Sequence, residues 1–237
     1  MTAARADAEY TAPVEDYLKV IYDIERHAGA AGTNDIAQRL AIAPASVSGM
    51  VRRLADQGLL EHERYRGVRL TDMGRRVALR TIRRHRVIEA YLTLALGYPW
   101  DLVHDEAERL EHAASDELID RMAAAIGEPS TDPHGAPIPT REGEIEERAL
   151  HSLADLAPGE RGRVVRVSDD DAERLRYLAE LGLVPGTEVL LLSRAPYGGP
   201  LALLVGAGPN ADESVAGAGE RMVGPALAAA VLVEREA

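Results

Sequence analysis

The sequence contains no cysteine among its 237 residues. This absence excludes a disulfide framework, a thiolate metal site, a cysteine nucleophile and a cysteine-held iron–sulfur cluster. No apolar run approaches the ~20 residues that a bilayer crossing needs, and residues 1–17 lack the apolar stretch of a signal peptide. We therefore expect a cytoplasmic protein that has no membrane partner. The hydrophobic fraction of 46% is enough to form packed cores.

Positive charge is scarce overall but concentrated near the N-terminus. The formal net charge is −12, yet residues 1–90 carry 15 basic and 12 acidic residues, which gives +3 against −15 for the remainder. Residues 50–86 alone hold 11 arginines and 4 acidic residues. A basic segment in an acidic protein can bind nucleic acid, although a solvated helix surface explains the same charge pattern.

The N-terminal third has the pattern of a winged helix-turn-helix. Apolar residues recur at helical spacing over residues 13–27. Two shorter helical stretches follow, one with Thr33 or Asn34 as its N-cap and one that begins at Pro44. Residues 59–71 then form two short extended runs joined by a turn. Because this motif lays its second helix in the major groove, we expect double-stranded DNA as a partner.

The rest of the chain is first helical and then rich in short strands. We expect a long helix that Thr71 caps and that runs to about Leu96, and another over residues 101–126, of which 115–126 can be a separate segment. Four prolines and two glycines mark residues 129–143 as a linker or irregular loop. Beyond Ser152, strand-like runs that include ALAAAVLVE surround one helical stretch, which suggests a small SH3-like β-barrel.

Histidines and glutamates cluster in the helical region. Three of the seven histidines lie within residues 85–112, and His85 and Glu89 are four residues apart on one helix face. Four further candidates would share one stripe of the following helix: His104, Glu108, Glu111 and His112. Such residues on facing helices can form a metal site, whereas acidic stripes are otherwise usually solvated.

This ligand set offers carboxylate oxygen and imidazole nitrogen without sulfur. It suits Mn²⁺ or Fe²⁺, and Zn²⁺, Co²⁺ or Ni²⁺ can also bind such groups. A metal-assisted hydrolase is conceivable on these ligands. The sequence nevertheless contains no HExxH, GxSxG or P-loop motif, so we expect that the protein is not an enzyme.

Several segments resemble the diphtheria-toxin-repressor family of metal-dependent transcriptional repressors, most closely its manganese-responsive branch. The resemblance rests on VEDYLKVIY, PASVSGMVRRL, ERYRGVRLT, RRHRVIEAYL, HDEAERLEHAASDEL, GAPIP and LAELGLVPGTEV. It implies a mainly α-helical protein with a small amount of β-structure, which controls metal homeostasis genes as a homodimer on palindromic operators. The implied domains are a winged helix-turn-helix domain (1–74), a helical dimerisation and metal-binding domain (75–143) and an SH3-like, FeoA-type domain (144–237).

The resemblance also implies two metal sites. The primary, regulatory site would consist of Asp16, Glu108, Glu111 and His112. The ancillary site would consist of His85, Glu89 and His104. Asp16 and Glu108 stand where iron-responsive members carry sulfur ligands, and this exchange for oxygen favours Mn²⁺. Asp171 lies near the position from which the SH3-like domain of some members reaches an ancillary metal.

One position departs from the manganese branch. Its members place a glutamate where this chain has Lys19, and a protonated lysine cannot bind a metal. The resemblance therefore favours two separated sites over a compact binuclear one. We expect the unmetallated carboxylates to repel one another, so that a divalent ion joins the DNA-binding domain to the dimerisation helices.

Candidate DNA contacts follow from the winged helix-turn-helix pattern. Small residues of the second helix allow a close approach, hydroxyl groups can bind phosphates or base edges, and arginines can bind the DNA backbone. The residues concerned are Thr33, Ala43, Ala45, Ser46, Ser48, Arg52 and, in the wing, Arg64, Tyr65 and Arg66. The two serines could equally be simple helix-start residues.

Three functional hypotheses remain distinguishable. A metal-activated repressor requires metal for DNA binding, whereas a winged-helix regulator of an organic ligand binds DNA regardless of chelators. The third hypothesis is a metalloenzyme, which would show open coordination positions and turnover. Within the first hypothesis, an iron-dependent repressor of the same family is the alternative to a manganese-dependent one.

Overall fold

The computed structural model describes residues 10–63, 67–146, 148–168, 171–206 and 219–235. These residues form two compact units. Of these described residues, the first unit comprises those up to His85 together with 109–116 and 139–145. The second comprises 86–108, 117–138 and the described residues from Glu146 onward. No helix among the described residues combines the length and apolar character that a membrane span requires.

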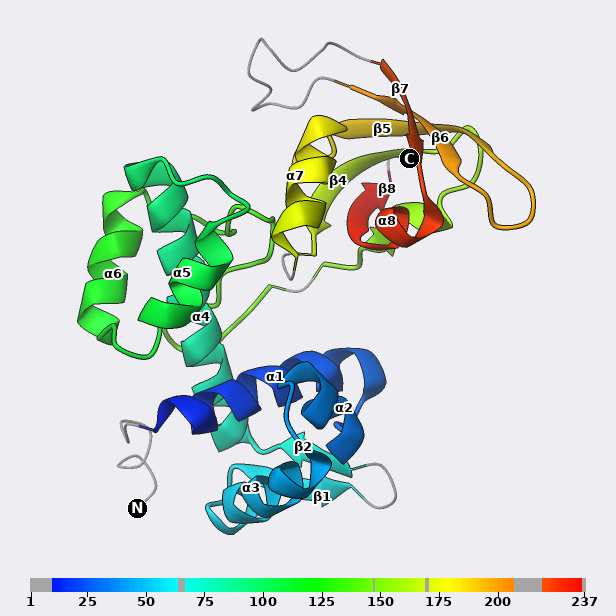
Figure 1. Ribbon diagram of the computed structural model, residues 1–237. Helices are drawn as coiled ribbons and strands as arrows, with labels where there is room; N and C mark the ends of the chain where they lie inside the picture. The colour runs from blue at the N-terminus through cyan, green and yellow to red at the C-terminus, as the bar shows by residue number, and fades with distance from the viewer. Residues whose placement is uncertain (1–9, 64–66, 147, 169–170, 207–218, 236–237) are drawn as a thin grey trace. The chain divides into compact units, whose positions relative to one another are not determined.

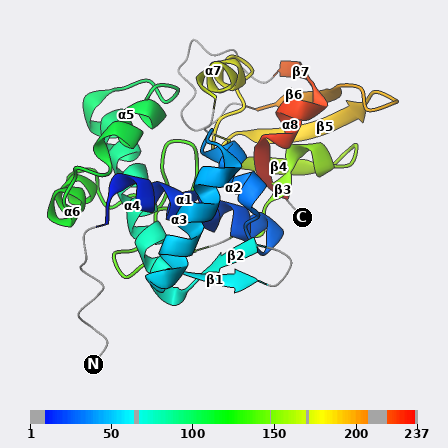
Figure 2. The ribbon, with the colours of Figure 1, turned by 60° about the horizontal axis from the view of Figure 1, so that its bottom comes forward.

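The first unit contains the expected winged helix-turn-helix (Figures 1 and 2). Its elements are α1 (Ala12–Ala28), α2 (Thr33–Arg39), α3 (Pro44–Asp56), β1 (Leu60–Glu63), β2 (Gly67–Leu70) and the first part of α4 (Asp72–Leu96). The strands pair in antiparallel fashion. The prediction of Thr33 or Asn34 as the N-cap of α2 is wrong. The N-cap is Gly32, which has no side chain to accept a hydrogen bond. At α4 the prediction is confirmed, since the Thr71 hydroxyl accepts from the Gly74 amide at 3.1 Å.

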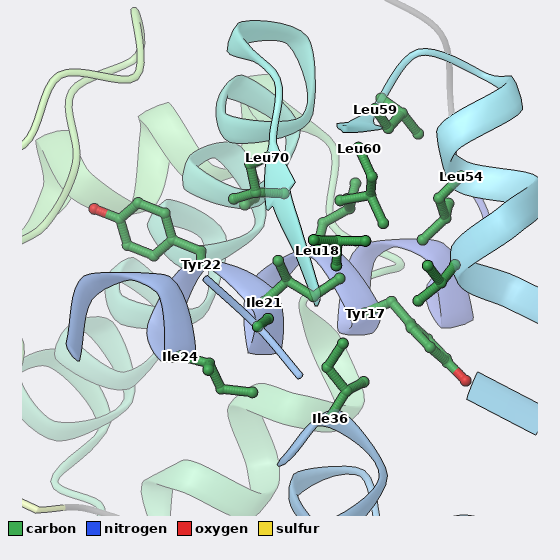
Figure 3. Close-up of a cluster of buried hydrophobic side chains, with 14 of the residues drawn as sticks. Tyr17, Leu18, Ile21, Tyr22, Ile24, Ile36, Leu54, Leu59, Leu60 and Leu70 are labelled. Carbon is green, nitrogen blue, oxygen red and sulfur yellow. The ribbon is translucent and has the colours of Figure 1, made fainter. Parts of the chain in front are cut away.

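One face of α1 forms much of the core of this unit. Leu18 and Ile21 are fully buried, and α2 and α3 contribute Ile36 and Leu54 to the same cluster (Figure 3). Burying a leucine or isoleucine contributes about 1.5–3 kcal/mol of transfer free energy. The tight packing of α1 fixes the direction in which its polar residues point, and these include Asp16.

The expected helix over residues 101–126 is interrupted. The structure has α5 (Val103–Leu110) and α6 (Asp116–Ala125), and Glu111 begins a turn between them. The amides of Ala113 and Ala114 both donate to the Leu110 carbonyl, at 3.0 and 3.1 Å, which closes this turn. Glu111 and His112 therefore do not continue the α5 stripe, so the expected single stripe from His104 to His112 is wrong.

The C-terminal part of the second unit is an antiparallel sheet with strand order β3-β8-β4-β5-β6-β7 among the described residues (Figure 1). Its elements are β3 (His151–Ser152), a 3-10 turn (Leu153–Asp155), β4 (Arg161–Val167), α7 (Ala172–Glu180), β5 (Glu188–Arg194), β6 (Leu201–Val205), β7 (Gly219–Val223), α8 (Pro225–Ala229) and β8 (Val231–Arg235). Leu175 and Leu178 of α7 are fully buried in the core of this sheet. The interpretation of ALAAAVLVE as one strand is wrong in its first half, which forms α8 after Pro225.

The irregular segment after α6 is anchored to β4. The Val167 amide donates to the His134 carbonyl at 2.9 Å, and Gly135 beside it has a φ of +86°. A Cβ at Gly135 would lie 1.8 Å from the Val165 carbonyl oxygen. Only glycine allows this approach of the loop to the strand, so the position of His134 depends on Gly135.

Gly135→Ala is therefore expected to destabilise the protein strongly. Gly127→Ala is a matched control, because Gly127 has a similar φ of +82° but a Cβ added there would meet nothing within 4 Å. We expect the control to lower the free energy of unfolding by ~1–2 kcal/mol through backbone strain alone. Gly135→Ala should lower it by at least twice as much in urea unfolding. Equal losses would show that the close approach to Val165 is unimportant.

Candidate metal centre

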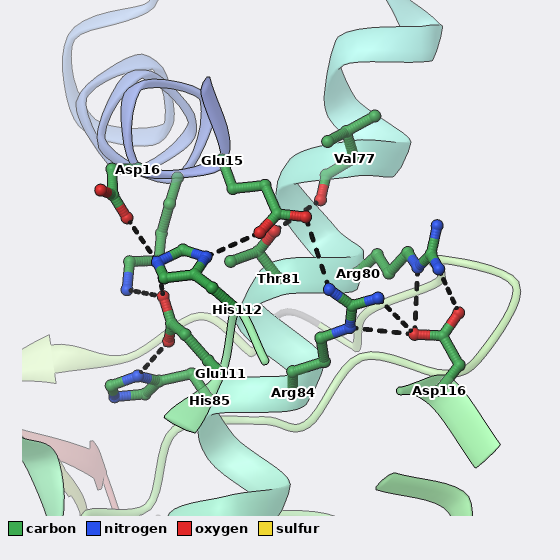
Figure 4. Close-up of polar contacts among 11 residues, drawn as sticks. Glu15, Asp16, Val77, Arg80, Thr81, Arg84, His85, Glu111, His112 and Asp116 are labelled. Carbon is green, nitrogen blue, oxygen red and sulfur yellow. Dashed lines mark hydrogen bonds and ion pairs between the residues drawn. The ribbon is translucent and has the colours of Figure 1, made fainter. Parts of the chain in front are cut away.

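Three predicted ligand residues converge in the first unit. Asp16, Glu111 and His112 each offer one ligand atom, and these atoms all lie within 4.8 Å of one another. Asp16 comes from the first turns of α1, whereas Glu111 and His112 come from the turn that follows α5 (Figure 4). The interruption of the helix at Leu110 thus presents two consecutive side chains to one aspartate.

The imidazole of His112 contacts carboxylates through both nitrogens. Its Nε2 is 2.9 Å from Asp16 Oδ1 and 3.4 Å from Glu111 Oε1. Its Nδ1 is 2.6 Å from Glu15 Oε2. Glu15 is not among the residues predicted from the sequence, although a signal was present: Glu15 shares an i, i+3, i+7 stripe with the buried Leu18 and Tyr22.

Glu111 is a fully buried carboxylate with two nitrogen partners. Lys19 Nζ lies 2.7 Å from its Oε1, and His85 Nδ1 lies 2.5 Å from its Oε2. Burial alone would raise the pKa of the Glu111 carboxyl, but the hydrogen bond from His85 and the charge of Lys19 outweigh burial and lower that pKa. The expected repulsion among unmetallated carboxylates is therefore wrong at Glu111, because the chain supplies its own positive partners.

A second group lies entirely in the second unit and includes two residues that were not predicted from the sequence. Glu89, Asp132 and His134 are buried, and each offers one ligand atom within 4.8 Å of the others. His134 Nε2 donates to the Trp100 carbonyl at 2.8 Å, which leaves Nδ1 facing Glu89 Oε1 at 3.9 Å. The motif GAPIP follows His134 directly, but nothing in the sequence alone brings Asp132 and His134 to Glu89.

The other predicted ligands have the following neighbours within their own units. His104 lies 3.4 Å from Glu89 Oε1 through Nδ1 and 3.9 Å from Glu108 Oε1 through Nε2. His85 contacts Glu111, as described above. Asp171 caps α7 by accepting from the Arg174 amide at 3.0 Å. The roles of His85, Glu89, His104 and Glu108 as metal ligands stay predictions.

Both groups fit a divalent cation by the chemistry of their donors. Each combines two carboxylates with one imidazole, a set suited to Mn²⁺, Fe²⁺ and later first-row metals. In each group the histidine nitrogen that does not face the group donates to a fixed acceptor, an arrangement typical of metal-binding histidines.

The candidate DNA-binding surface is the outer face of α3. Ala43, Ala45, Ser46, Ser48 and Arg52 are exposed, and the Ser48 hydroxyl donates to the Pro44 carbonyl at 3.3 Å. Thr33 is partly exposed at the start of α2. The predicted wing residues Arg64, Tyr65 and Arg66 lie outside the described residues. The exposed face thus offers small residues, hydroxyls and a cation for approach to DNA.

Three sequence families match successive parts of the chain. Residues 9–68 match the "Iron dependent repressor, N-terminal DNA binding domain", and residues 71–140 match the "Iron dependent repressor, metal binding and dimerisation domain". Residues 151–235 match the FeoA domain. This last match confirms the predicted SH3-like C-terminal domain.

Named relatives include both iron- and manganese-dependent repressors. The iron-dependent repressor IdeR of Mycobacterium tuberculosis is 32% identical over 204 residues, which cover 81% of this chain and 88% of IdeR. The regulator MntR of Lysinibacillus sphaericus is 34% identical over 116 residues, which cover 49% of this chain and 83% of MntR. A solved manganese-dependent transcriptional repressor in complex with manganese is 37% identical, with a TM-score of 0.84 over 94% of this chain and all of that one.

These matches cover the DNA-binding, helical and C-terminal parts in the same order as the predicted architecture. The family consists of DNA-binding repressors, and this finding argues against the metalloenzyme hypothesis. The chain therefore belongs to the diphtheria toxin repressor family and is a metal-dependent transcriptional repressor.

Proposed function

We propose that Mn²⁺ is the co-repressor of this protein and that Asp16, Glu111 and His112 hold it. The observation that carries the proposal is the convergence of these three side chains without a sulfur ligand. Oxygen and imidazole donors suit Mn²⁺ and also Fe²⁺, whereas soft sulfur ligands would favour other metals. The manganese complex of the similar solved repressor supports Mn²⁺, and the iron-dependent relatives make Fe²⁺ the alternative to test.

Lys19 supports a single ion at this site. Its ammonium lies 2.7 Å from Glu111 Oε1, on the carboxylate that a second ion would have to share. An ammonium group has no lone pair to offer a metal and repels a nearby cation. We expect one ion at Asp16, Glu111 and His112, and a separate ion at Glu89, Asp132 and His134.

The position of the first site suggests how metal controls DNA binding. Asp16 belongs to α1, whose buried face packs with α2 and α3, while Glu111 and His112 belong to the matched metal-binding and dimerisation region. A bound divalent ion supplies positive charge that favours joining these carboxylates and the imidazole. Asp16 then fixes the helix-turn-helix to the part of the chain that forms a homodimer, which binds a palindromic operator.

DNA binding is expected to require metal. Metal and DNA binding should be coupled by ~1–3 kcal/mol, which corresponds to a 5–150-fold change in affinity. The measurement is a mobility shift of the full chain on a duplex selected from a random library by the Mn²⁺-loaded protein. Binding should fall on chelation and return with Mn²⁺, and a parallel Fe²⁺ series under anaerobic conditions compares the two metals. Chelated protein that binds as tightly as loaded protein would contradict the co-repressor role.

The two groups should bind ions independently. His112→Ala should remove one Mn²⁺ per chain and leave the other, and His134→Gln should remove one as well, so the double variant loses two. Titration followed by electron paramagnetic resonance of free Mn²⁺ counts the ions. Loss of both ions in either single variant would show that the groups form one shared site.

Arg52 on α3 is expected to contact the DNA backbone. Arg52→Ala should weaken DNA binding across sequences and reduce the slope of log affinity against log salt by about 1. Its Mn²⁺ affinity should equal that of the unmodified protein, because Arg52 is not part of either ligand group. Arg163→Ala, which changes a half-exposed arginine of β4, is the matched control and should alter neither quantity. An unchanged salt slope for Arg52→Ala would place the DNA elsewhere.

A further inference from the structure

We infer that Glu15 is a positioning residue that determines which nitrogen of His112 faces the metal. This inference rests on the proposed function, because it concerns the site formed by Asp16, Glu111 and His112. Glu15 itself is outside the group of ligand atoms, and it acts through the imidazole that it contacts.

The imidazole of His112 lies between two consecutive residues of α1. Its Nδ1 is 2.6 Å from Glu15 Oε2, while Nε2 is 2.9 Å from Asp16 Oδ1 (Figure 4). A carboxylate accepts, so Nδ1 carries the proton that it donates to Glu15. Nε2 can donate to Asp16 in the same way, and an ion bound by Asp16 and Glu111 would take the place of that proton while Nδ1 keeps its own on Glu15.

Glu15 is not a solvated surface carboxylate. Its side chain is 8% exposed and lies on the α1 stripe that also carries the buried Leu18 and Tyr22. A carboxylate in a core position is costly unless charged or hydrogen-bonding partners surround it. Glu15 has such partners on both oxygens, since Arg84 Nη1 lies 3.4 Å from Oε1 and His112 Nδ1 contacts Oε2.

Arg84 is itself held in place. Its Nε and Nη2 each lie 2.9 Å from Asp116 Oδ1, and Arg80 Nη2 lies 2.7 Å from Asp116 Oδ2. The Arg84 guanidinium therefore cannot rotate freely, and it occupies the Oε1 side of Glu15. This arrangement leaves Oε2 directed at His112, so the network from Asp116 through Arg84 to Glu15 orients the imidazole.

The role of Glu15 can be tested with two substitutions. Glu15→Leu removes the acceptor but keeps a side chain of similar size, and it should weaken Mn²⁺ binding 10–100-fold, as loss of such partners does at other metal sites. Glu15→Gln keeps an oxygen that accepts from Nδ1, so it should lose less affinity than the leucine variant. Mn²⁺ affinity is measured on the full chain by titration of free Mn²⁺.

Glu25→Gln is the matched control. Glu25 also lies on α1 and is mostly buried, and its Oε1 is 2.6 Å from Arg75 Nη2, but it does not contact His112. Its substitution measures the effect of neutralising an arginine-paired carboxylate on this helix, and Mn²⁺ affinity should stay within twofold of the unmodified protein. If Glu15→Leu fails to fold, Glu15→Gln must bind Mn²⁺ more weakly than Glu25→Gln, and equal affinities would overturn the inference.

A second measurement does not depend on metal. In metal-free protein with ¹⁵N-labelled histidine, NMR should show a hydrogen-bonded Nδ1 proton on His112, assigned by its loss in His112→Ala. Glu15→Gln should keep this signal and Glu15→Leu should lose it. An unmodified protein that binds no Mn²⁺ would refute the proposed co-repressor while this signal still decides the role of Glu15. A signal that persists in Glu15→Leu would overturn the positioning role.

Discussion

A buried carboxylate constrains the first unit more than any other group. Glu111 is fully removed from solvent, and an isolated charge in that position would be very costly. The chain meets this requirement with Lys19 from α1, with His85 from α4 and with the neighbouring His112. Because these partners come from segments far apart in the sequence, satisfying Glu111 fixes the turn after α5 against α1 and α4. The candidate metal site is a consequence of that arrangement.

In both ligand groups a hydrogen bond from one ring nitrogen orients the histidine. In the first, His112 Nδ1 donates to Glu15, and in the second, His134 Nε2 donates to the Trp100 carbonyl. Each bond holds a proton on one ring nitrogen and leaves the opposite nitrogen facing carboxylates. The acceptor can be a side chain or the backbone, and the nitrogen used differs, so no single sequence motif describes both. What they share is a hydrogen bond from the ring nitrogen that points away from the ligand group.

The sequence predicts the elements well because periodicity and turn residues act locally. The boundaries of α1 and α3, the hairpin and the capping of α4 by Thr71 follow from residues within a few positions. The predicted elements are wrong at two places where the chain changes its local structure within a continuous pattern, namely the turn after Leu110 and α8. For the site, the resemblance rather than the periodicity identified Asp16. Asp132 and His134 were missed because their approach to Glu89 depends on the loop that Gly135 attaches to β4.

The presence of internal cations bears on how a metal can act as a signal. Lys19 lies beside Glu111, and Arg86 Nε lies 3.5 Å from Asp132 Oδ2, so each ligand group already has a positive neighbour of its own. A structural zinc site, by contrast, contributes the folding free energy of its domain, and the domain unfolds without the ion. Here the chain itself supplies positive partners for the carboxylates. Because these partners offset the buried charge, we expect a divalent ion to add only part of the free energy that holds each unit together. Such a modest and reversible contribution is what a repressor needs if its DNA affinity is to follow the metal supply.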